Sequence, residues 1–171
     1  MKLQKRLANL NLESKPIPRE KFVKPMAATT TSNFGESRAY SLDGIDAGGS
    51  THDGLDLASV KRDKVLASNS GTVVLAEHFG IYGNALVIDH GMGLISLYGQ
   101  LSELEVSVGQ DVERKELIGR SGETGLAGGD HLHFEYRIAN IPVNPREWLD
   151  ANWVKNHVFR KIEKVSKSLS N

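Results

Sequence analysis

The β-strand pattern on which the fold prediction rests lies in the segment His131-Leu132-His133-Phe134-Glu135-Tyr136-Arg137-Ile138. Polar and apolar side chains alternate along it, and successive side chains of a β-strand point to opposite faces of a sheet. We therefore expect His131, His133 and Glu135 on one face of a strand, and the leucine and aromatic residues on the other. The polar face is then available to line a site, while the apolar face packs into the core.

Upstream of this strand, further short runs of β-forming residues are separated by glycine-containing turns. They are Gly71–Ala76, Ala85–Asp89, Leu94–Tyr98, Glu105–Val108 and Leu117–Arg120. Runs that recur roughly every 8–12 residues are typical of an all-β meander or barrel-like sheet. No predicted helix between them is long enough for a crossover between parallel strands. The sequence predicts an all-β fold, mostly an antiparallel sheet that forms an open groove, with short helical appendages at both ends.

The chain divides into three predicted segments. Residues 1–28 form an N-terminal appendage or linker, because the prolines within it stop any long helix. Residues 29–150 form the β domain, which ends in a helix start where Asn144 caps and Pro145 follows. Residues 151–171 form a C-terminal amphipathic helical tail with apolar residues at helical spacing, namely Val158, Ile162, Val165 and Leu169.

The composition, with 39% hydrophobic residues, is that of a globular protein. It contains no cysteine, which excludes disulfides and thiolate metal ligands. No run of about 18 apolar residues exists, so no membrane-spanning segment is predicted in this chain. The N-terminus lacks the apolar core of a signal peptide, so we expect any export signal to lie outside this sequence. Positions 25–151 hold nine basic and eighteen acidic residues, which argues against nucleic acid as a partner.

Two histidine patterns suit a metal ion. His52 and Asp56 share one face if their stretch is extended, and His131 and His133 share the polar face of the strand. Zinc favours imidazole and carboxylate ligands, and a catalytic zinc ion uses three of them and leaves a fourth position for water. Two histidines and Asp56 fit that number. The remaining histidine would lie beside the metal and move protons.

The motifs around these residues follow a specific order along about two-thirds of the chain. They are Phe34-Gly35-Glu36-Ser37-Arg38, His52-Asp53-Gly54-Leu55-Asp56-Leu57-Ala58, Gly71-Thr72-Val73, Tyr82-Gly83-Asn84, Val87-Ile88-Asp89-His90-Gly91, Leu97-Tyr98-Gly99-Gln100-Leu101-Ser102, Gly122-Glu123-Thr124-Gly125 and His131-Leu132-His133-Phe134-Glu135. In this order they resemble the lysostaphin-type (LytM-like) zinc metalloendopeptidases, a family of peptidoglycan hydrolases.

This resemblance implies a function and a role for each site residue. It implies that Zn²⁺ is bound by His52, Asp56 and His133, and that His131 is the catalytic histidine. The family cleaves peptide bonds in the stems or cross-links of peptidoglycan. The expected partner is therefore a peptidoglycan peptide, and the expected location is the bacterial cell envelope, periplasmic or extracellular. The glycine-rich loop 125–129 would form a wall of the substrate groove, where missing side chains let a peptide approach.

The chain departs from the family at Gln100, where the motif Tyr-x-His-Leu-Ser has its histidine. A glutamine amide still donates a hydrogen bond to a carbonyl oxygen, so we expect Gln100 to keep part of the catalytic role of that position. It does not exchange a proton near neutral pH, and losing a general acid–base group costs about 10²–10⁴ in rate. Two functions follow. One is a zinc endopeptidase with reduced activity, and the other is a catalytically impaired domain that binds peptidoglycan or activates another hydrolase.

The remaining patterns receive simpler interpretations. His90 is expected near a turn without a direct role, and His78 and His157 at the surface. For Glu135, support of a ligand histidine and exposure to solvent both stay open. Residues 153–171 are expected to pack on the body or a partner chain, with membrane-surface binding as the alternative. A resemblance of residues 108–112 to biotinyl and lipoyl carrier domains is rejected, because the modifiable Met-Lys motif is absent.

Overall fold

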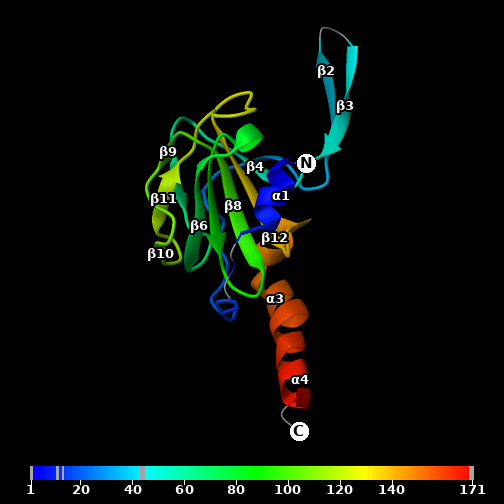
Figure 1. Ribbon diagram of the computed structural model, residues 1–171, viewed down its shortest axis with the longest axis vertical. Helices are drawn as coiled ribbons and strands as arrows, with labels where there is room; N and C mark the ends of the chain where they lie inside the picture. Colours follow the sequence, from blue (N-terminus) through cyan, green and yellow to red (C-terminus); the bar gives the residue numbers. More distant parts are fainter. Residues whose placement is uncertain (1, 11, 13, 43–44, 170–171) are drawn as a thin grey trace.

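A large antiparallel sheet forms the centre of the molecule (Figure 1). The computed structural model describes residues 2–10, 12, 14–42 and 45–169. Within these residues the strand order is β1-β4-β12-β8-β7-β6-β10, and β13 pairs with β12. The strands are β1 (Thr30–Ser32), β4 (Leu55–Ala58), β6 (Gly71–His78), β7 (Asn84–Asp89), β8 (Leu94–Leu101), β10 (Asp111–Val112), β12 (His131–Ile138) and β13 (Ile141–Val143).

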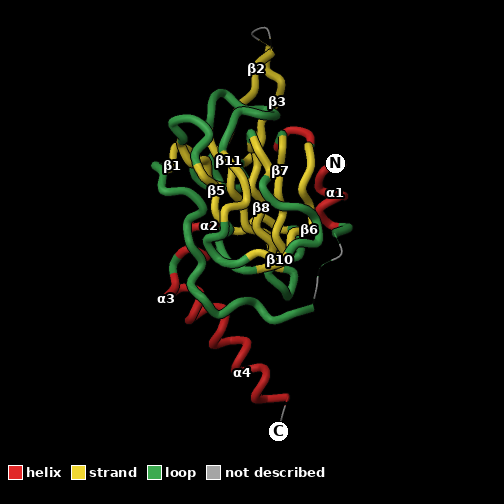
Figure 2. The backbone as a smooth tube through the Cα atoms, turned by 90° about the vertical axis from the view of Figure 1, so that its left-hand side faces the viewer, coloured by secondary structure: helices red, strands yellow, loops and turns green. Residues whose placement is uncertain are grey.

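Two smaller sheets complete the β structure. One contains β5 (Lys64–Leu66), β11 (Leu117–Arg120) and β9 (Glu103–Leu104), and the other is the hairpin of β2 (Ser37–Leu42) and β3 (Ile45–Thr51). Figure 2 shows the strands gathered in one block, with the β2–β3 hairpin extending from one end. All strand pairs in the described part of the chain are antiparallel. The predicted mostly antiparallel β fold is confirmed, while the open groove stays a prediction.

The large sheet carries an apolar layer on each face. On one face, Leu132, Phe134 and Tyr136 of β12 pack with residues of the three-stranded sheet such as Val65 and Ile118. This is the apolar face that alternation along β12 predicts. On the other face, a second layer joins the sheet to the short helix α1 (Lys2–Ala8) and includes Leu7, Leu75, Val87, Ile95 and Leu97.

The segment that precedes the β domain contributes to the core. Phe22 is 1% exposed, and its ring meets Tyr136 and Trp148 edge to face at centroid distances of 5.6 and 5.5 Å. The next residue, Val23, donates its backbone N–H to the carbonyl of Ser68 at 2.9 Å. Trp148 lies in α2 (Pro145–Leu149), so segments from both ends of the chain meet over the sheet.

The C-terminal part of the chain is helical. The helix α2 begins as predicted, with Pro145 as its first residue and the Asn144 side chain accepting the Arg146 N–H at 3.1 Å. It is followed by α3 (Ala151–Val154), the π-helical turn η2 (Lys155–Phe159) and α4 (Arg160–Leu169). The helix α4 extends away from the body (Figures 1 and 2) and exposes Val165 and Leu169. Among the described residues, no helix has the length and apolar character needed to cross a membrane.

The predicted strand Glu105–Val108 is wrong. The two-residue strand β9 ends just before it, and the chain then enters a turn in which Gly109 has φ +87°. Val106 is buried, but Val108 is 63% exposed. Only one apolar residue of the run packs inward, so its β-like composition did not correspond to pairing with a neighbouring strand.

Candidate metal centre

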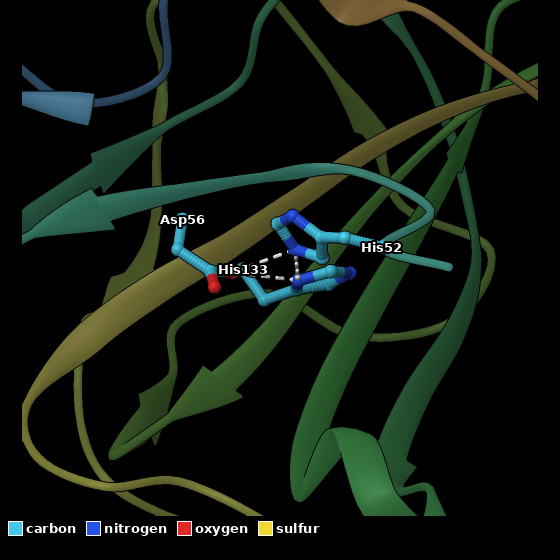
Figure 3. A group of neighbouring side chains, drawn as sticks. All are labelled: His52, Asp56 and His133. Carbon is cyan, nitrogen blue, oxygen red and sulfur yellow. Dashed lines mark hydrogen bonds and ion pairs between the residues drawn. The ribbon is translucent and has the colours of Figure 1, made fainter. Parts of the chain in front are cut away.

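Three side chains converge at one end of β12 (Figure 3). Nε2 of His52 lies 3.1 Å from Oδ1 of Asp56 and 3.2 Å from Nδ1 of His133. Nδ1 of His133 lies 2.9 Å from the same Asp56 oxygen. All three residues are buried. The structure thus brings together the two histidines and the aspartate that the family resemblance implies as a set.

The backbone explains why these residues meet. Asp56 on β4 and His133 on β12 are direct register partners on neighbouring strands, and cross-strand partners have adjacent side chains. His52 lies after β3 in the turn that leads into β4, so the turn and not an extended strand brings it to Asp56. Gly54 permits this turn, because a Cβ at that position would lie 2.4 Å from the carbonyl oxygen of Phe134.

The cluster fits a zinc ion. Zinc–ligand bonds of about 2.0–2.2 Å place tetrahedral ligand atoms roughly 3.3 Å apart, close to the observed separations of 2.9 to 3.2 Å. Nδ1 of His52 donates to the carbonyl of Asn33 at 2.8 Å, and Nε2 of His133 donates to Glu135 at 2.8 Å. Each bond places a ring proton away from the cluster, so that the opposite nitrogen can bind a metal.

Two carboxylates make the cluster favour positive charge. Burial lowers the pKa of His133, but hydrogen bonds to Asp56 and Glu135 outweigh burial and raise it to about 9. Burial raises the pKa of Asp56, but its bonds to His133 and His52 outweigh that effect and hold the pKa well below the ordinary value. A divalent metal ion would take the place of the proton that this field favours.

Glu135 supports the cluster from within the protein. It is fully buried and accepts hydrogen bonds from His133, from Tyr82 Oη at 2.8 Å and from Arg137 Nε at 2.7 Å. Burial raises the pKa of Glu135, but His133 and Arg137 outweigh burial and keep the pKa below its ordinary value. Arg137 also donates to Asp53 at 2.8 Å. Of the two alternatives for Glu135, support of a histidine is the one that the geometry favours.

His131 lies beside the cluster and does not join its closest contacts. Its Nδ1 donates to the carbonyl of Gly129 at 2.8 Å. Its Nε2 lies 3.9 Å from Oδ1 of Asp56, and its side chain is 19% exposed. Nε2 is therefore the ring nitrogen nearest to Asp56, and the side chain is partly accessible to solvent.

A β-bulge directs Gln100 away from the core. The pairing of β7 with β8 shifts register between Tyr98 and Leu101, and both of these side chains belong to the apolar layer. The two residues between them, Gly99 and Gln100, therefore turn to the opposite face. Gln100 has φ +59°, in the left-handed region. Bulges of this kind commonly re-aim a side chain beside a functional site.

The side chain of Gln100 bonds to a carbonyl that also binds the neighbouring loop. Its Nε2 donates to the carbonyl of Ile81 at 3.1 Å, and the same carbonyl accepts the N–H of Leu126 at 2.9 Å. Its Oε1 is buried and has no hydrogen-bond partner among the described residues. The turn η1 (Gly80–Tyr82) and the loop 122–130 pack backbone against backbone here, since a Cβ on Gly125 would lie 2.3 Å from the nitrogen of Gly83.

The other histidines lie outside the cluster. His90 is fully buried, with Nδ1 2.8 Å from the carbonyl of Ser70 and Nε2 2.7 Å from Oγ of Ser96. His78 is exposed at the end of β6, and His157 is exposed and stacks on Trp153. The buried hydrogen bonds of His90 give it a structural role.

Several residues next to the cluster were given no role in the site by the sequence. Arg38 forms an ion pair with Oδ2 of Asp56, Ser32 Oγ lies 3.2 Å from Nδ1 of His52, and Asn33 accepts from the same ring. These residues come from β1, β2 and the segment between them, so only the fold brings them here. Arg137 could have been found, because alternation along β12 places it on the face of Glu135.

Comparisons with known proteins show which family the chain resembles. Residues 50–145 match the profile of Peptidase family M23. Over 94 residues the chain is 42% identical to the DD-carboxypeptidase/endopeptidase Mpg of Neisseria meningitidis. The matched region covers 55% of this chain and 22% of that protein. Over 96 residues it is 36% identical to the murein hydrolase activator EnvC of Escherichia coli. This matched region covers 56% of this chain and 23% of that protein.

A solved structure has a similar fold. A zinc containing peptidase from Vibrio cholerae superposes with a TM-score of 0.63 at 29% identity, over 80% of this chain and 40% of that chain. The chain spans less than a quarter of the length of Mpg and of EnvC. The similarity therefore concerns one domain of each of these longer proteins.

Proposed function

Because the chain belongs to peptidase family M23, we propose that it is a zinc-dependent endopeptidase that hydrolyses peptide bonds in the stems or cross-links of peptidoglycan. The observation that carries this proposal is the triangle of His52, Asp56 and His133, whose metal-facing atoms lie 2.9 to 3.2 Å apart. These residues would hold the zinc ion. A bound zinc ion would supply a Lewis acid that polarises a peptide carbonyl and lowers the pKa of a water molecule.

His131 is the proton-transfer residue in this proposal. Its Nδ1–H bond to the carbonyl of Gly129 leaves Nε2, which lies toward Asp56, as the ring nitrogen that can exchange a proton. That nitrogen can take a proton from the attacking water and then give it to the leaving amine, as a general base and then a general acid. Because its side chain is part exposed, a substrate can reach it.

Gln100 contributes position and not proton transfer. The amide has no protonation step near neutral pH, and its bond to Ile81 uses one of its two amide hydrogens. The second hydrogen can point to the oxygen of a peptide carbonyl, which would stabilise negative charge that develops there. We therefore propose a reduced rate relative to a site with histidine at position 100.

A second candidate function is a domain that binds peptidoglycan, or activates another hydrolase, without cleaving it. Gln100 favours it, and so does the similarity to a protein named as a murein hydrolase activator. The complete set of His52, Asp56 and His133, with both ring protons held away from the cluster, favours the enzyme. Either function places the protein in the bacterial cell envelope with a peptidoglycan peptide as its partner.

One experiment separates the two functions. Purified protein is loaded with zinc, its metal content is measured, and it is incubated with peptidoglycan whose released fragments are identified by mass spectrometry. The enzyme predicts about one zinc per chain and new amino termini at a single type of peptide bond. The zinc-loaded His131→Ala protein serves as the control, because it should keep the metal and lose cleavage. Full zinc occupancy with no cleavage of several wall types would favour the non-cleaving domain.

A further inference from the structure

Two arginines flank the metal cluster on the side of β1. The guanidinium of Arg38 contacts Oδ2 of Asp56 and lies 3.3 Å from Oγ of Ser32. The guanidinium of Arg146 donates to Oδ1 of Asn33 at 2.6 Å. Ser32 and Asn33 both contact the His52 ring. Each arginine is therefore separated from the His52 ring by a single residue.

Both arginines keep hydrogen-bond donors for another molecule. The side-chain contacts of Arg38 and of Arg146 with described residues all use Nη2. Within the part of the chain that the structure describes, Nε and Nη1 of each residue contact no acceptor. The Arg38 side chain is 38% exposed, and Arg146 is exposed. An arginine presents its donors as a planar fork that matches the two oxygens of a carboxylate.

The charge around these arginines is positive, although the body of the chain is acidic. Lys24 adds a third cation, and its pKa is lowered by burial and then by the charge of Arg146. Two acids lie within this group. Asp56 is in contact with Arg38, and the two oxygens of Glu36 already accept from Ser32 and Asn33 at 2.7 Å each. Between positions 25 and 151, acidic residues outnumber basic ones by eighteen to nine. Cations beside the cluster are therefore a local feature that the overall charge does not explain.

We propose that Arg38 and Arg146 form a carboxylate-binding subsite, so that the preferred substrate is a peptide with a free carboxylate close to the bond that is cleaved. This inference rests on the proposed peptidase function and specifies its substrate. Arg38 would bind nearer the reacting bond, because it touches Asp56, and Arg146 would bind further along the peptide. Both act by charge-assisted hydrogen bonds, which are roughly twice as strong as neutral ones.

The test compares two forms of one substrate. Soluble peptidoglycan fragments are used untreated, or after their carboxylates have been converted to carboxamides with carbodiimide and ammonia. Cleavage kinetics and equilibrium binding are measured for the zinc-loaded protein, Arg38→Gln, Arg146→Gln and Arg114→Gln. Arg114 is the matched control. It lies in the turn between β10 and β11 and forms an ion pair with Glu20, so it contacts no residue of the proposed subsite. Zinc content is measured for each variant, since Arg38 contacts Asp56 and Arg146 contacts none of the three cluster residues.

The unmodified protein and Arg114→Gln should prefer the untreated fragments by about tenfold or more, mainly through KM and Kd. For Arg38→Gln and for Arg146→Gln, the KM and Kd values of the two fragment forms should lie within about twofold of each other. The zinc content of Arg146→Gln should be unchanged. Equal binding of both forms by the unmodified protein would overturn the inference. Preferential binding without any cleavage would support the subsite and count against the proposed peptidase, so the two failures are distinguishable.

Discussion

Nε2 of His133 lies 2.8 Å from Oε1 of Glu135, two residues further along the same strand. This contact fixes which ring nitrogen of His133 carries its proton and therefore which one faces Asp56. Arg137, two residues further still, holds the other oxygen of Glu135 at 2.7 Å. One face of β12 thus carries a histidine of the cluster, the carboxylate that orients it and the cation that balances the carboxylate.

Glu135→Gln is expected to weaken zinc binding by about 10- to 100-fold, as for other groups that orient a ligand histidine. The amide keeps the size of the side chain but loses the charge that favours His133. Zinc affinity is measured by competition with a chelator. Glu113→Gln, at an exposed position after β10, is the control and should bind zinc as the unmodified protein does. The same affinity in Glu135→Gln would show that Glu135 does not act on His133.

Alanine at a ligand and at His131 should have different effects. His133→Ala and Asp56→Ala are expected to lose most of the bound zinc, because each removes one of three converging atoms. His131→Ala should keep the metal and lose hydrolysis by about 10²–10⁴. Metal content after dialysis and the rate of fragment release are measured together. Equal loss of metal in all three variants would contradict the separation of ligand and proton-transfer roles.

Gln100→His is expected to raise peptidoglycan hydrolysis by at least about tenfold, because it supplies an imidazole for acid–base chemistry. The left-handed φ of +59° at this position is one that histidine adopts more readily than most residues. Zinc content should not change, since Gln100 is not one of the three converging residues. Gln100→Ala is the matched comparison, and it should lower the rate by releasing Ile81. No gain from histidine would show that another group already fills the role.

The strand-level features of the site could be predicted from the sequence because they depend on local periodicity. Alternation along β12 placed Leu132, Phe134 and Tyr136 in the core, as the structure confirms. The same alternation placed His133 and Glu135 on the opposite face. Both conclusions need only the two-residue period of a strand.

Features that depend on contacts between distant segments could not be predicted. Arg38 reaches Asp56 through the β2–β3 hairpin, and no local pattern fixes where that hairpin points. Phe22 is buried against Trp148, 126 positions away, although the prolines around it suggest a linker. The bulge that turns Gln100 is one extra residue in β8, and the apolar pattern does not reveal it. Each of these is a property of pairing between strands or segments.

His90 should make the protein less stable in mild acid. Burial, which outweighs its bond to Ser70, lowers the pKa of His90 from 6.5 to about 4. Between these two values the unfolded chain binds more protons than the folded chain. The contribution of His90 to the free energy of unfolding is therefore complete above about pH 6.5 and falls as the pH drops toward 4, by on the order of 2–3 kcal/mol.

Denaturant unfolding at pH 7.5 and pH 5 measures this effect. His90→Gln should be less stable at pH 7.5, and its stability should depend less on pH than that of the unmodified protein. His78→Gln is the control. Because His78 is exposed, this substitution should leave the free energy of unfolding at pH 7.5 and at pH 5 unchanged. The same pH dependence in His90→Gln and the unmodified protein would assign the acid sensitivity to other groups.

The β2–β3 hairpin and α4 extend from opposite ends of the molecule (Figures 1 and 2). His52 directly follows β3, so the cluster of His52, Asp56 and His133 lies near the base of the hairpin. The ten residues of α4 form a rod of about 15 Å. A solid support or a fluorescent label coupled to the far end of α4 would be spaced from the body by that rod. The protein could then be immobilised with the end that carries His52, Asp56 and His133 directed outward, where insoluble cell walls could reach it.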